Sequence, residues 1–230
     1  MANFKTDGTY LLVGKTNTGK TTFLKALLTN LGRQFDLIVG FSKTKFKGSI
    51  NYCPPQFQFD DWNEDKIEKL MNWMQHLVKY NIKVAIILDD MIGDIKVHNN
   101  RVFDKLATRC RHYNITLFIV SQYLLKLSPP LRSNANYLIC TRMTREDEIK
   151  CLWKEFGSSM DWPSFKDKFM MDTYNFGVFV IDNSGPEVKF QGMRCLSNIA
   201  PFRIPISDRL IQLDRMIQMQ STGLKGRRGH

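Results

Sequence analysis

The chain has 230 residues, of which 43% are hydrophobic, and a formal net charge of +11. This length fits one large domain or a domain with appendages, with ample apolar content for a buried core. Its longest apolar runs, residues 84–88 and 177–181, are far too short to cross a bilayer, and the polar N-terminus lacks a signal-peptide core. The five cysteines are odd in number and never spaced as C-x-x-C, which argues against a disulfide framework or a zinc site. We therefore expect a soluble protein that is not secreted and has no membrane span.

Strand and helix patterns alternate along the chain. Near-continuous apolar runs predict strands over residues 10–14, 35–41, 84–90, 115–121, 137–141 and 176–182. Helical periodicity fills the intervals at residues 21–31, 64–80, 101–112, 145–156, 162–171 and 208–220. This succession predicts an α/β fold of three layers around a mainly parallel sheet. Residues 176–193 read as a hairpin around Asn183–Pro186, so that end of the sheet is expected to be antiparallel.

We divide the chain into a domain at residues 1–193 and a C-terminal helix with a basic tail at residues 194–230. The second segment holds seven Arg or Lys against two Asp, a net charge of +5. Its last ten residues are expected to form a flexible basic tail.

The first strand leads directly into Gly14-x-x-x-x-Gly19-Lys20-Thr21, which is the P-loop spacing. Two glycines let the backbone curl so that N–H groups point at phosphates, at the positive end of the following helix. In this pattern the lysine reaches the β- and γ-phosphates and the threonine hydroxyl binds Mg²⁺. A plain glycine turn is the alternative, but the apolar strand before it and the amphipathic segment after it favour nucleotide binding. The predicted nucleotide-binding residues are Gly14, Lys15, Thr16, Asn17, Thr18, Gly19, Lys20, Thr21 and Thr22.

The predicted strand at residues 84–90 ends in two carboxylates, Asp89 and Asp90, the Walker B arrangement. They fall at the carboxyl edge of the sheet, where the P-loop also opens. We expect Asp89 to hold Mg²⁺ together with Thr21, and Asp90 to be the base that deprotonates the attacking water. Alternatives are a strand-end Asp-Asp turn and a GTPase switch, since Asp90-Met-Ile-Gly93 reads D-x-x-G, but no guanine-reading motif follows.

The strand at residues 115–121 is followed by Gln122. An amide at this edge can hydrogen-bond the γ-phosphate or its water and report hydrolysis to the rest of the protein. Alone, Gln122 would be an ordinary strand-end residue. Beside the P-loop and the two carboxylates it is predicted to be a sensor.

The order of these parts resembles a known superfamily. The P-loop, Leu88-Asp89-Asp90, and the segment Arg109–Thr116 leading into the Gln122 strand are similar to the FtsK–HerA superfamily of DNA-pumping ATPases. The closest likeness is to the poxvirus-type genome-packaging ATPases of large DNA viruses and virophages, over residues 8–182. The resemblance implies a RecA-like (ASCE) fold with the Gln122 strand between the P-loop and Walker B strands. Many members carry Glu at the position of Asp90, so the base in this chain would be one methylene shorter.

The resemblance also implies an activity and partners. It implies Mg²⁺-dependent ATP hydrolysis that drives double-stranded DNA into a preformed capsid. Such motors are homo-oligomeric rings, here a hexamer or a pentamer, that work with capsid or portal-site proteins in the host cytoplasm, at the virus factory, or in the virion. In such rings an arginine of one subunit reaches the nucleotide of the next. Arg111 best matches that position, Arg109 is the alternative, and Arg132 and Arg142 could also face a neighbour. A basic helix end that complements the helix dipole is the competing explanation for Arg109 and Arg111.

DNA contacts are not marked by any helix-turn-helix, zinc-finger or RNP motif. A ring could present basic loop and tail residues to its pore, where they would grip phosphates without reading sequence. By default each of them is a solvated surface charge. The candidates are Lys43, Lys45, Lys47, Lys96, Lys225, Arg227 and Arg228.

Three other functions fit parts of the pattern. A segregation or conjugation translocase would share the chemistry, but such proteins usually carry membrane segments or further domains. A non-motor nucleotide switch or small-molecule kinase is disfavoured by Gln122 and the basic tail. A DNA-binding module with a vestigial P-loop is disfavoured by the intact Lys20, Thr21 and Asp89.

Overall fold

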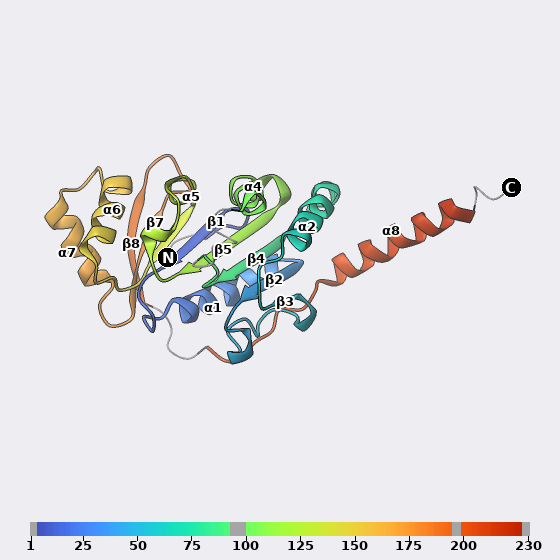
Figure 1. The fold of residues 1–230 in the computed structure, drawn as a ribbon, viewed down its shortest axis with the longest axis horizontal. Helices are drawn as coiled ribbons and strands as arrows, with labels where there is room; N and C mark the ends of the chain where they lie inside the picture. The colour runs from blue at the N-terminus through green and yellow to red at the C-terminus, as the bar shows by residue number, and fades with distance from the viewer. Residues whose placement is uncertain (1–3, 93–99, 195–198, 227–230) are drawn as a thin grey trace.

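The structure, a computed structural model, describes residues 4–92, 100–194 and 199–226, with side chains described as far as Gln218. These residues form an eight-stranded sheet in the order β3-β2-β4-β5-β1-β6-β7-β8 (Figure 1). Helices cover both faces of the sheet, which confirms the predicted three-layer α/β fold. Within the described residues, no helix combines the length and apolar character needed to cross a membrane.

The sheet is parallel over its first six strands. β1 lies between β5 and β6, and β5 lies between β1 and β4. The antiparallel pairs β6–β7 and β7–β8 close the other end, as the hairpin pattern predicts. The strands are β1 (Thr9–Val13), β2 (Leu37–Ser42), β3 (Gln58–Phe59), β4 (Val84–Asp89), β5 (Ile115–Ser121), β6 (Tyr137–Cys140), β7 (Gly177–Asp182) and β8 (Lys189–Arg194).

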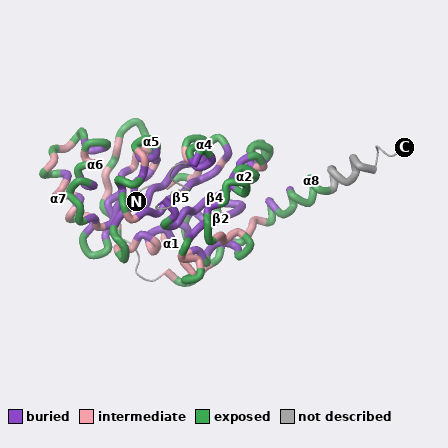
Figure 2. Tube along the Cα trace, in the orientation of Figure 1, coloured by how far each residue is buried: buried purple, intermediate pink, exposed green. Residues whose placement is uncertain are grey.

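Two apolar cores lie on the two faces of the sheet, because alternate residues of each strand point to opposite sides. On one face, Tyr10, Leu12 and Phe118 pack against α1 (Lys20–Leu31). On the other face, Leu11 and Leu117 share a core with the remaining helices. These are α2 (Glu64–Leu77), α4 (Arg101–Arg109), α5 (Pro129–Ser133), α6 (Glu146–Phe156), α7 (Trp162–Asp172) and the start of α8 (Asp208–Gly226). Figure 2 shows the central strands buried throughout.

Each predicted strand and helix is found, with ends shifted by a few residues. Two short elements, β3 and α5, were not predicted. The helix predicted to end at Gln220 continues to Gly226, so the expected flexible tail is wrong for residues 221–226; residues 227–230 lie outside the described part. Cys53, Cys110 and Cys140 are buried free thiols and Cys151 is a half-buried free thiol, whereas Cys195 is not described.

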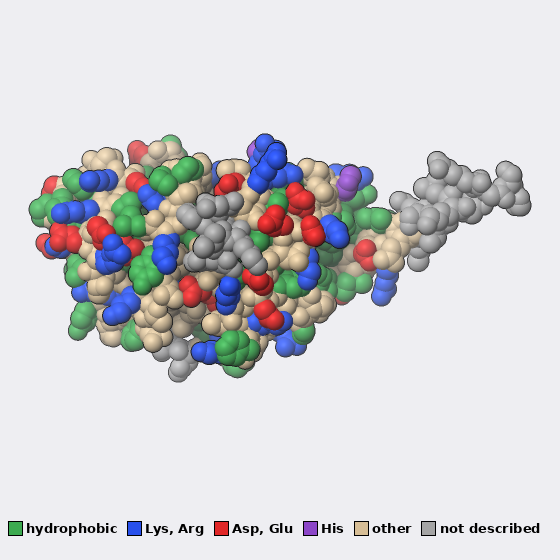
Figure 3. All heavy atoms as spheres, viewed as in Figure 1, with side chains coloured by type: hydrophobic (Ala, Val, Ile, Leu, Met, Phe, Trp, Pro, Cys, Tyr) green, Lys and Arg blue, Asp and Glu red, His purple; other side chains and the backbone are tan. Residues whose placement is uncertain are grey.

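Charged side chains of both signs are spread over the face shown in Figure 3. The face in Figure 3 carries Lys and Arg interspersed with Asp and Glu, without a continuous basic area. The excess of basic residues therefore does not form a single patch on this face.

Residues 199–207 run back across the sheet domain before α8 begins. The Ile204 amide donates to the Tyr52 carbonyl at 2.9 Å, and the Ser207 amide to the Asp36 carbonyl at 2.9 Å. The Ser207 hydroxyl donates to Asp36 Oδ1 at 2.6 Å and accepts from the Leu210 amide in the first turn of α8. Asp36 Oδ2 accepts from the Lys83 amide at 2.9 Å. One buried carboxylate thus joins β2, the start of β4 and α8, beyond which the helix projects from the body (Figure 1).

We predict that Asp36→Ala lowers the free energy of unfolding by about 2–3 kcal/mol, because hydrogen bonds to a charged group contribute about 1.5–3 kcal/mol and their donors lose their partner. Urea denaturation measures the change. Asp60→Ala is the matched control, since Asp60 is 77% exposed and pairs with Lys45 at the surface; it should cost less than about 0.5 kcal/mol. Equal losses in the two variants would contradict this account.

Candidate functional site

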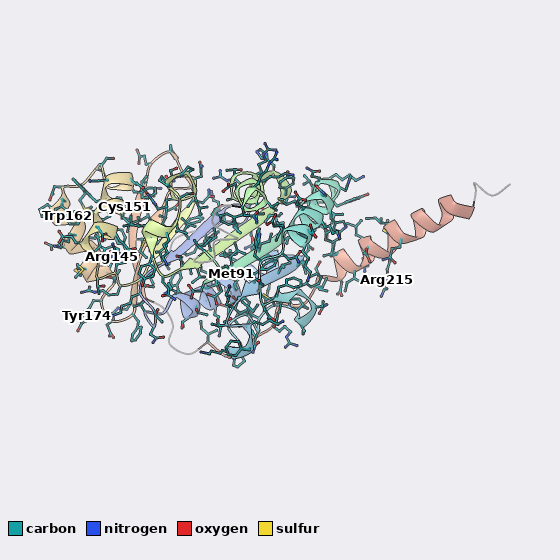
Figure 4. The ribbon with its side chains drawn as sticks, viewed as in Figure 1. Met91, Arg145, Cys151, Trp162, Tyr174 and Arg215 are labelled. Carbon is teal, nitrogen blue, oxygen red and sulfur yellow. The ribbon has the colours of Figure 1, made fainter. Side chains whose placement is uncertain are left out.

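Sheet topology brings the sequence motifs together. β1, β5 and β4 are adjacent and parallel, so the residues that follow them emerge at the same edge. The P-loop follows β1, Gln122 follows β5, and Asp89 and Asp90 end and follow β4. The Gln122 strand lies between the other two, which confirms the strand order that the family resemblance implies. Met91, next to Asp90, marks this region in Figure 4.

The P-loop backbone adopts conformations that favour glycine. Gly14 and Gly19 have φ angles of 145° and 96°, and Asn17 has a φ of 62°. Helix α1 begins directly after Gly19, with no capping side chain and no acidic residue in its first turn. Its first N–H groups therefore lack a side-chain acceptor, as an anion-binding helix start requires.

Lys20 is folded over the loop that precedes it. Its ammonium group donates to the carbonyl oxygens of Gly14 and Lys15, at 2.7 and 2.8 Å. Burial lowers the pKa of Lys20, and the carboxylates of Asp90 and Asp89 oppose that shift. The lysine charge is thus held between the loop and the two acids.

The two carboxylates differ in environment. Asp89 is 6% exposed, and burial raises its pKa to about 6, with a further upward contribution from Asp90. Lys20 and a hydrogen bond from Ser42 act in the opposite direction. Asp90 is exposed, has a left-handed backbone with φ 58°, and accepts a hydrogen bond from Gln122 Nε2 at 2.8 Å. Asp89 therefore suits a cation, whereas Asp90 faces solvent beside the predicted sensor.

These groups surround a cavity of about 280 Å³. Most of the predicted site residues line it, including Thr21 and both carboxylates. Thr44 and Ser49, from the segment after β2, were missed by sequence reasoning, although their place after a neighbouring strand was a signal that could have found them. The lining residues are Thr16, Asn17, Gly19, Lys20, Thr21, Thr22, Thr44, Ser49, Asp89, Asp90, Val120 and Gln122.

Three predicted P-loop residues do not line this cavity. Gly14 and Lys15 supply the carbonyls that hold Lys20. The Thr18 hydroxyl points instead to Thr141, with 2.6 Å between their oxygens, and donates to the Lys15 carbonyl. Their contribution is to the shape of the loop.

The cavity is lined by side chains of the kinds that could hold a Mg²⁺ ion and the phosphates of a nucleotide. A hydroxyl and a buried carboxylate, Thr21 and Asp89, line one wall, with Lys20 between the loop and the acids. Among the described residues no group of three or more His, Cys, Asp or Glu is clustered as a metal site. A Mg²⁺ ion would therefore take most of its ligands from phosphate and water, as this ion commonly does.

The arginines lie elsewhere. Arg111 is exposed in the turn before β5, at the opposite edge of the sheet, with its guanidinium 3.4 Å from the Asn134 carbonyl. Arg109 is also exposed there, beside His112 and Tyr113. Neither arginine lines the cavity.

The two other arginines that were expected to be able to face a neighbour, Arg132 and Arg142, form hydrogen bonds within the chain. Arg132 is 5% exposed and forms a bidentate ion pair with Glu155, so the expectation that it could face a neighbour is wrong. Arg142 donates to the Met170 carbonyl at 2.9 Å.

The basic DNA candidates have mixed surroundings. Lys45 pairs with Asp60 at 3.0 Å, and Lys47 is exposed next to Phe46. Lys96, Arg227 and Arg228 lie outside the described residues, and the side chain of Lys225 is not described.

A family model described as "Poxvirus A32 protein" matches residues 4–156, more than half of the chain. The chain belongs to the poxvirus A32 protein family. This membership agrees with the resemblance drawn from the motifs. The matched segment contains the P-loop, both carboxylates, Arg111 and Gln122, so the whole candidate site lies within the family region.

Viral relatives and solved structures extend the comparison. This A32 family member is 24% identical over 194 residues to uncharacterized protein 075L of Invertebrate iridescent virus 6, covering 80% of this chain and 75% of that protein. It is also 24% identical to uncharacterized protein 015R of Frog virus 3, covering 77% and 57%. The genome packaging NTPase B204 of Sulfolobus turreted icosahedral virus 2, solved with AMPPCP, matches with a TM-score of 0.59 at 15% identity, over 81% of this chain and 98% of B204. The pCW3 conjugation coupling protein TcpA matches with a TM-score of 0.53 at 15% identity, over 83% and 61%. These structures share the fold.

We predict that Gly14→Ala abolishes measurable nucleotide binding. A Cβ at this position would overlap the Thr141 hydroxyl and lie 3.0 Å from the Thr141 carbonyl oxygen, and the φ of +145° is strained for alanine. The loop must move, and the variant should unfold at least about 1 kcal/mol more easily. Isothermal titration with ATP and urea denaturation measure the two effects.

Gly185→Ala is the control. A Cβ on Gly185, in the β7–β8 hairpin, would lie 3.9 Å from the Glu187 carbonyl oxygen, which is an ordinary contact. This variant should change neither the affinity for ATP nor the free energy of unfolding. Normal ATP binding by Gly14→Ala would show that the loop does not need this conformation.

Proposed function

We propose that this protein is an ATP hydrolase that packages double-stranded viral DNA into a capsid as a homo-oligomeric ring. The observation that carries the proposal is the convergence of Lys20, the Asp89–Asp90 pair and Gln122 on one cavity at the edge of the sheet. Family membership supports a viral packaging role, and one solved protein of the same fold is described as a genome packaging NTPase. Action would take place in the host cytoplasm, at the virus factory, or in the virion, together with capsid or portal-site proteins.

The P-loop would bind the triphosphate. The N–H groups at the start of α1 face the phosphates with the positive end of the helix, and Lys20 adds a full charge. Thr21 and Asp89 would hold Mg²⁺, which when bound neutralises charge on the β- and γ-phosphates. The burial of Asp89 favours this role, because a desolvated carboxylate is stabilised by a cation.

Hydrolysis would depend on Asp90 and Gln122, which lie beyond the proposed metal ligands. Asp90 is the proposed base, and the hydrogen bond from Gln122 fixes one of its oxygens at 2.8 Å. A water near the γ-phosphate could then give its proton to Asp90. Gln122 hydrogen-bonds Asp90 directly. Loss of the γ-phosphate would therefore alter this hydrogen bond, and the change would be transmitted to β5, which Gln122 follows.

The trans arginine would come from a neighbouring subunit. Arg111 lies before the seven residues of β5, and the cavity lies after them. At about 3.3 Å per residue the strand separates the two by on the order of 20 Å. Arg111 could therefore serve only a nucleotide held by another subunit, as in a ring where the amino edge of one sheet faces the carboxyl edge of the next.

DNA binding is supported more generally, by the net charge of +11. Contacts would come from separate loops and the C-terminal segment, where the sequence places the candidate Lys and Arg residues. Phosphate contacts of that kind give salt-sensitive, sequence-independent binding, which suits a motor. A conjugation-type translocase remains the second candidate, because TcpA shares the fold.

We expect Lys20→Ala to reduce ATP hydrolysis about 100-fold or more, since a lysine charge at the phosphates stabilises the transition state. Asp90→Asn should bind ATP normally yet lose at least about 100-fold in turnover, because asparagine can still accept from Gln122 but cannot take a proton. Steady-state hydrolysis with and without double-stranded DNA, and ATP titration, measure these effects. DNA should stimulate the wild type.

Lys25→Ala serves as the control, because Lys25 lies on α1 without lining the cavity, and it should hydrolyse ATP like the wild type. Wild-type turnover in Lys20→Ala would refute the P-loop assignment. Hydrolysis that ignores DNA would favour a nucleotide switch or kinase.

We expect Arg111→Ala to bind ATP with near-normal affinity and hydrolyse it about 1,000-fold more slowly, as for a trans arginine. Mixing it with Asp90→Asn should restore hydrolysis above the sum of the separate proteins, because a mixed ring pairs an intact cavity with an intact arginine. The restoration should require concentrations at which the subunits assemble. Arg109→Ala is the control, because Arg109 is exposed close to Arg111. Mixing Arg109→Ala with Asp90→Asn should not give hydrolysis above the sum of the separate proteins. Absence of rescue in confirmed mixed oligomers would make Arg111 a local structural residue.

A further inference from the structure

The turn between α7 and β7 exposes two aromatic rings beside the P-loop. Tyr174 is 69% exposed and Phe176 is 63% exposed. Figure 4 shows Tyr174 at the outer margin of the molecule, on this turn. The Phe176 ring lies so close to the loop that a Cβ built on Gly19 would be 3.8 Å from its Cδ1. Large apolar rings gain free energy when buried, so their exposure here calls for a reason.

A second cavity, of about 390 Å³, lies between this turn and the P-loop. Asn17 lines both this cavity and the phosphate cavity, so the two spaces adjoin. The other lining residues are Thr18, Arg142, Thr173, Tyr174, Asn175 and Phe176. Arg142 follows β6, which pairs with β1 on the side away from β5 and β4. The second cavity therefore lies on the side of the P-loop opposite to Asp89 and Asp90.

Phe176, in this turn, has a backbone conformation that phenylalanine disfavours. Asn175 and Phe176 have φ angles of 47° and 59°, and the left-handed region is unfavourable for a bulky residue such as phenylalanine. The Gly177 amide donates to the Tyr174 carbonyl at 3.0 Å, which closes the turn, and the buried Thr173 is hydrogen-bonded to Phe169. The turn that contains this strained residue exposes both aromatic side chains.

The two walls of the second cavity are joined by polar contacts. Arg142 donates to the Met170 carbonyl at 2.9 Å, which ties the end of β6 to the end of α7. On the P-loop side, the hydroxyls of Thr18 and Thr141 are 2.6 Å apart. Because both walls are attached to β6, the spacing between the loop and the aromatic turn is fixed by the sheet.

We propose that this second cavity binds the base of the nucleotide whose phosphates occupy the P-loop, and that Tyr174 and Phe176 stack on that base. The inference rests on the proposed nucleotide-binding function of the P-loop. A planar base has an aromatic face that matches exposed rings, and stacking of this kind contributes about fivefold to about a hundredfold in affinity per base. Asn17 belongs to both cavities, so one ligand can extend from one to the other past this residue.

The test compares ATP with inorganic tripolyphosphate, which has the phosphates and no base. Dissociation constants of both ligands are measured by isothermal titration on the full chain, with Mg²⁺, for the wild type, Tyr174→Ala and Phe176→Ala. Each variant should bind ATP at least about fivefold more weakly and bind tripolyphosphate within about twofold of the wild type. Tyr174→Phe and Phe176→Tyr, which keep the ring, should retain the affinity for ATP.

Met171→Ala is the matched control, because Met171 is 75% exposed at the end of α7 but does not line the cavity. It should leave both dissociation constants unchanged. Unchanged ATP affinity in both alanine variants, or an equal loss for ATP and tripolyphosphate, would overturn the base site. A wild-type protein that binds tripolyphosphate as tightly as ATP would also overturn it, while leaving the P-loop assignment intact. A wild-type protein that binds neither ligand would overturn both.

Discussion

The whole site depends on one pairing arrangement, the hydrogen bonding of β5 to β1 on one side and to β4 on the other. These three strands are parallel, so their carboxyl ends meet at one edge. The P-loop, Gln122 and the two carboxylates are far apart in the chain and come together only because of this order. All three strands are buried on both faces, which fixes their positions tightly.

Much of this was predictable from the sequence because the central strands are continuous apolar runs and the motifs follow them directly. β3 has two residues and α5 has five, too few for any periodicity to appear. Arg132 was misjudged because its partner Glu155 lies on α6, and no local pattern announces a long-range ion pair. Thr44 and Ser49 were missed for a related reason, since their approach to the cavity depends on how the chain folds back after β2.

The electrostatics of the cavity show why its groups belong together. Lys20 loses hydration on burial, and so does Asp89, and each shifts the pKa of the other in the direction that restores its charge. Buried charges are tolerated when they are paired, whereas a lone one is costly. Asp90 escapes this constraint by remaining exposed to solvent.

The contacts of Asp36 and Tyr52 with residues 204–207 determine how mechanical load would enter the molecule. A force applied along the projecting α8 would pass through Ser207 to Asp36 at the start of β2, and through Ile204 to Tyr52. Tyr52 lies in the same segment, between β2 and β3, that carries Thr44 and Ser49 to the cavity wall. A load on α8 would therefore reach the cavity through the segment after β2, which carries Thr44 and Ser49.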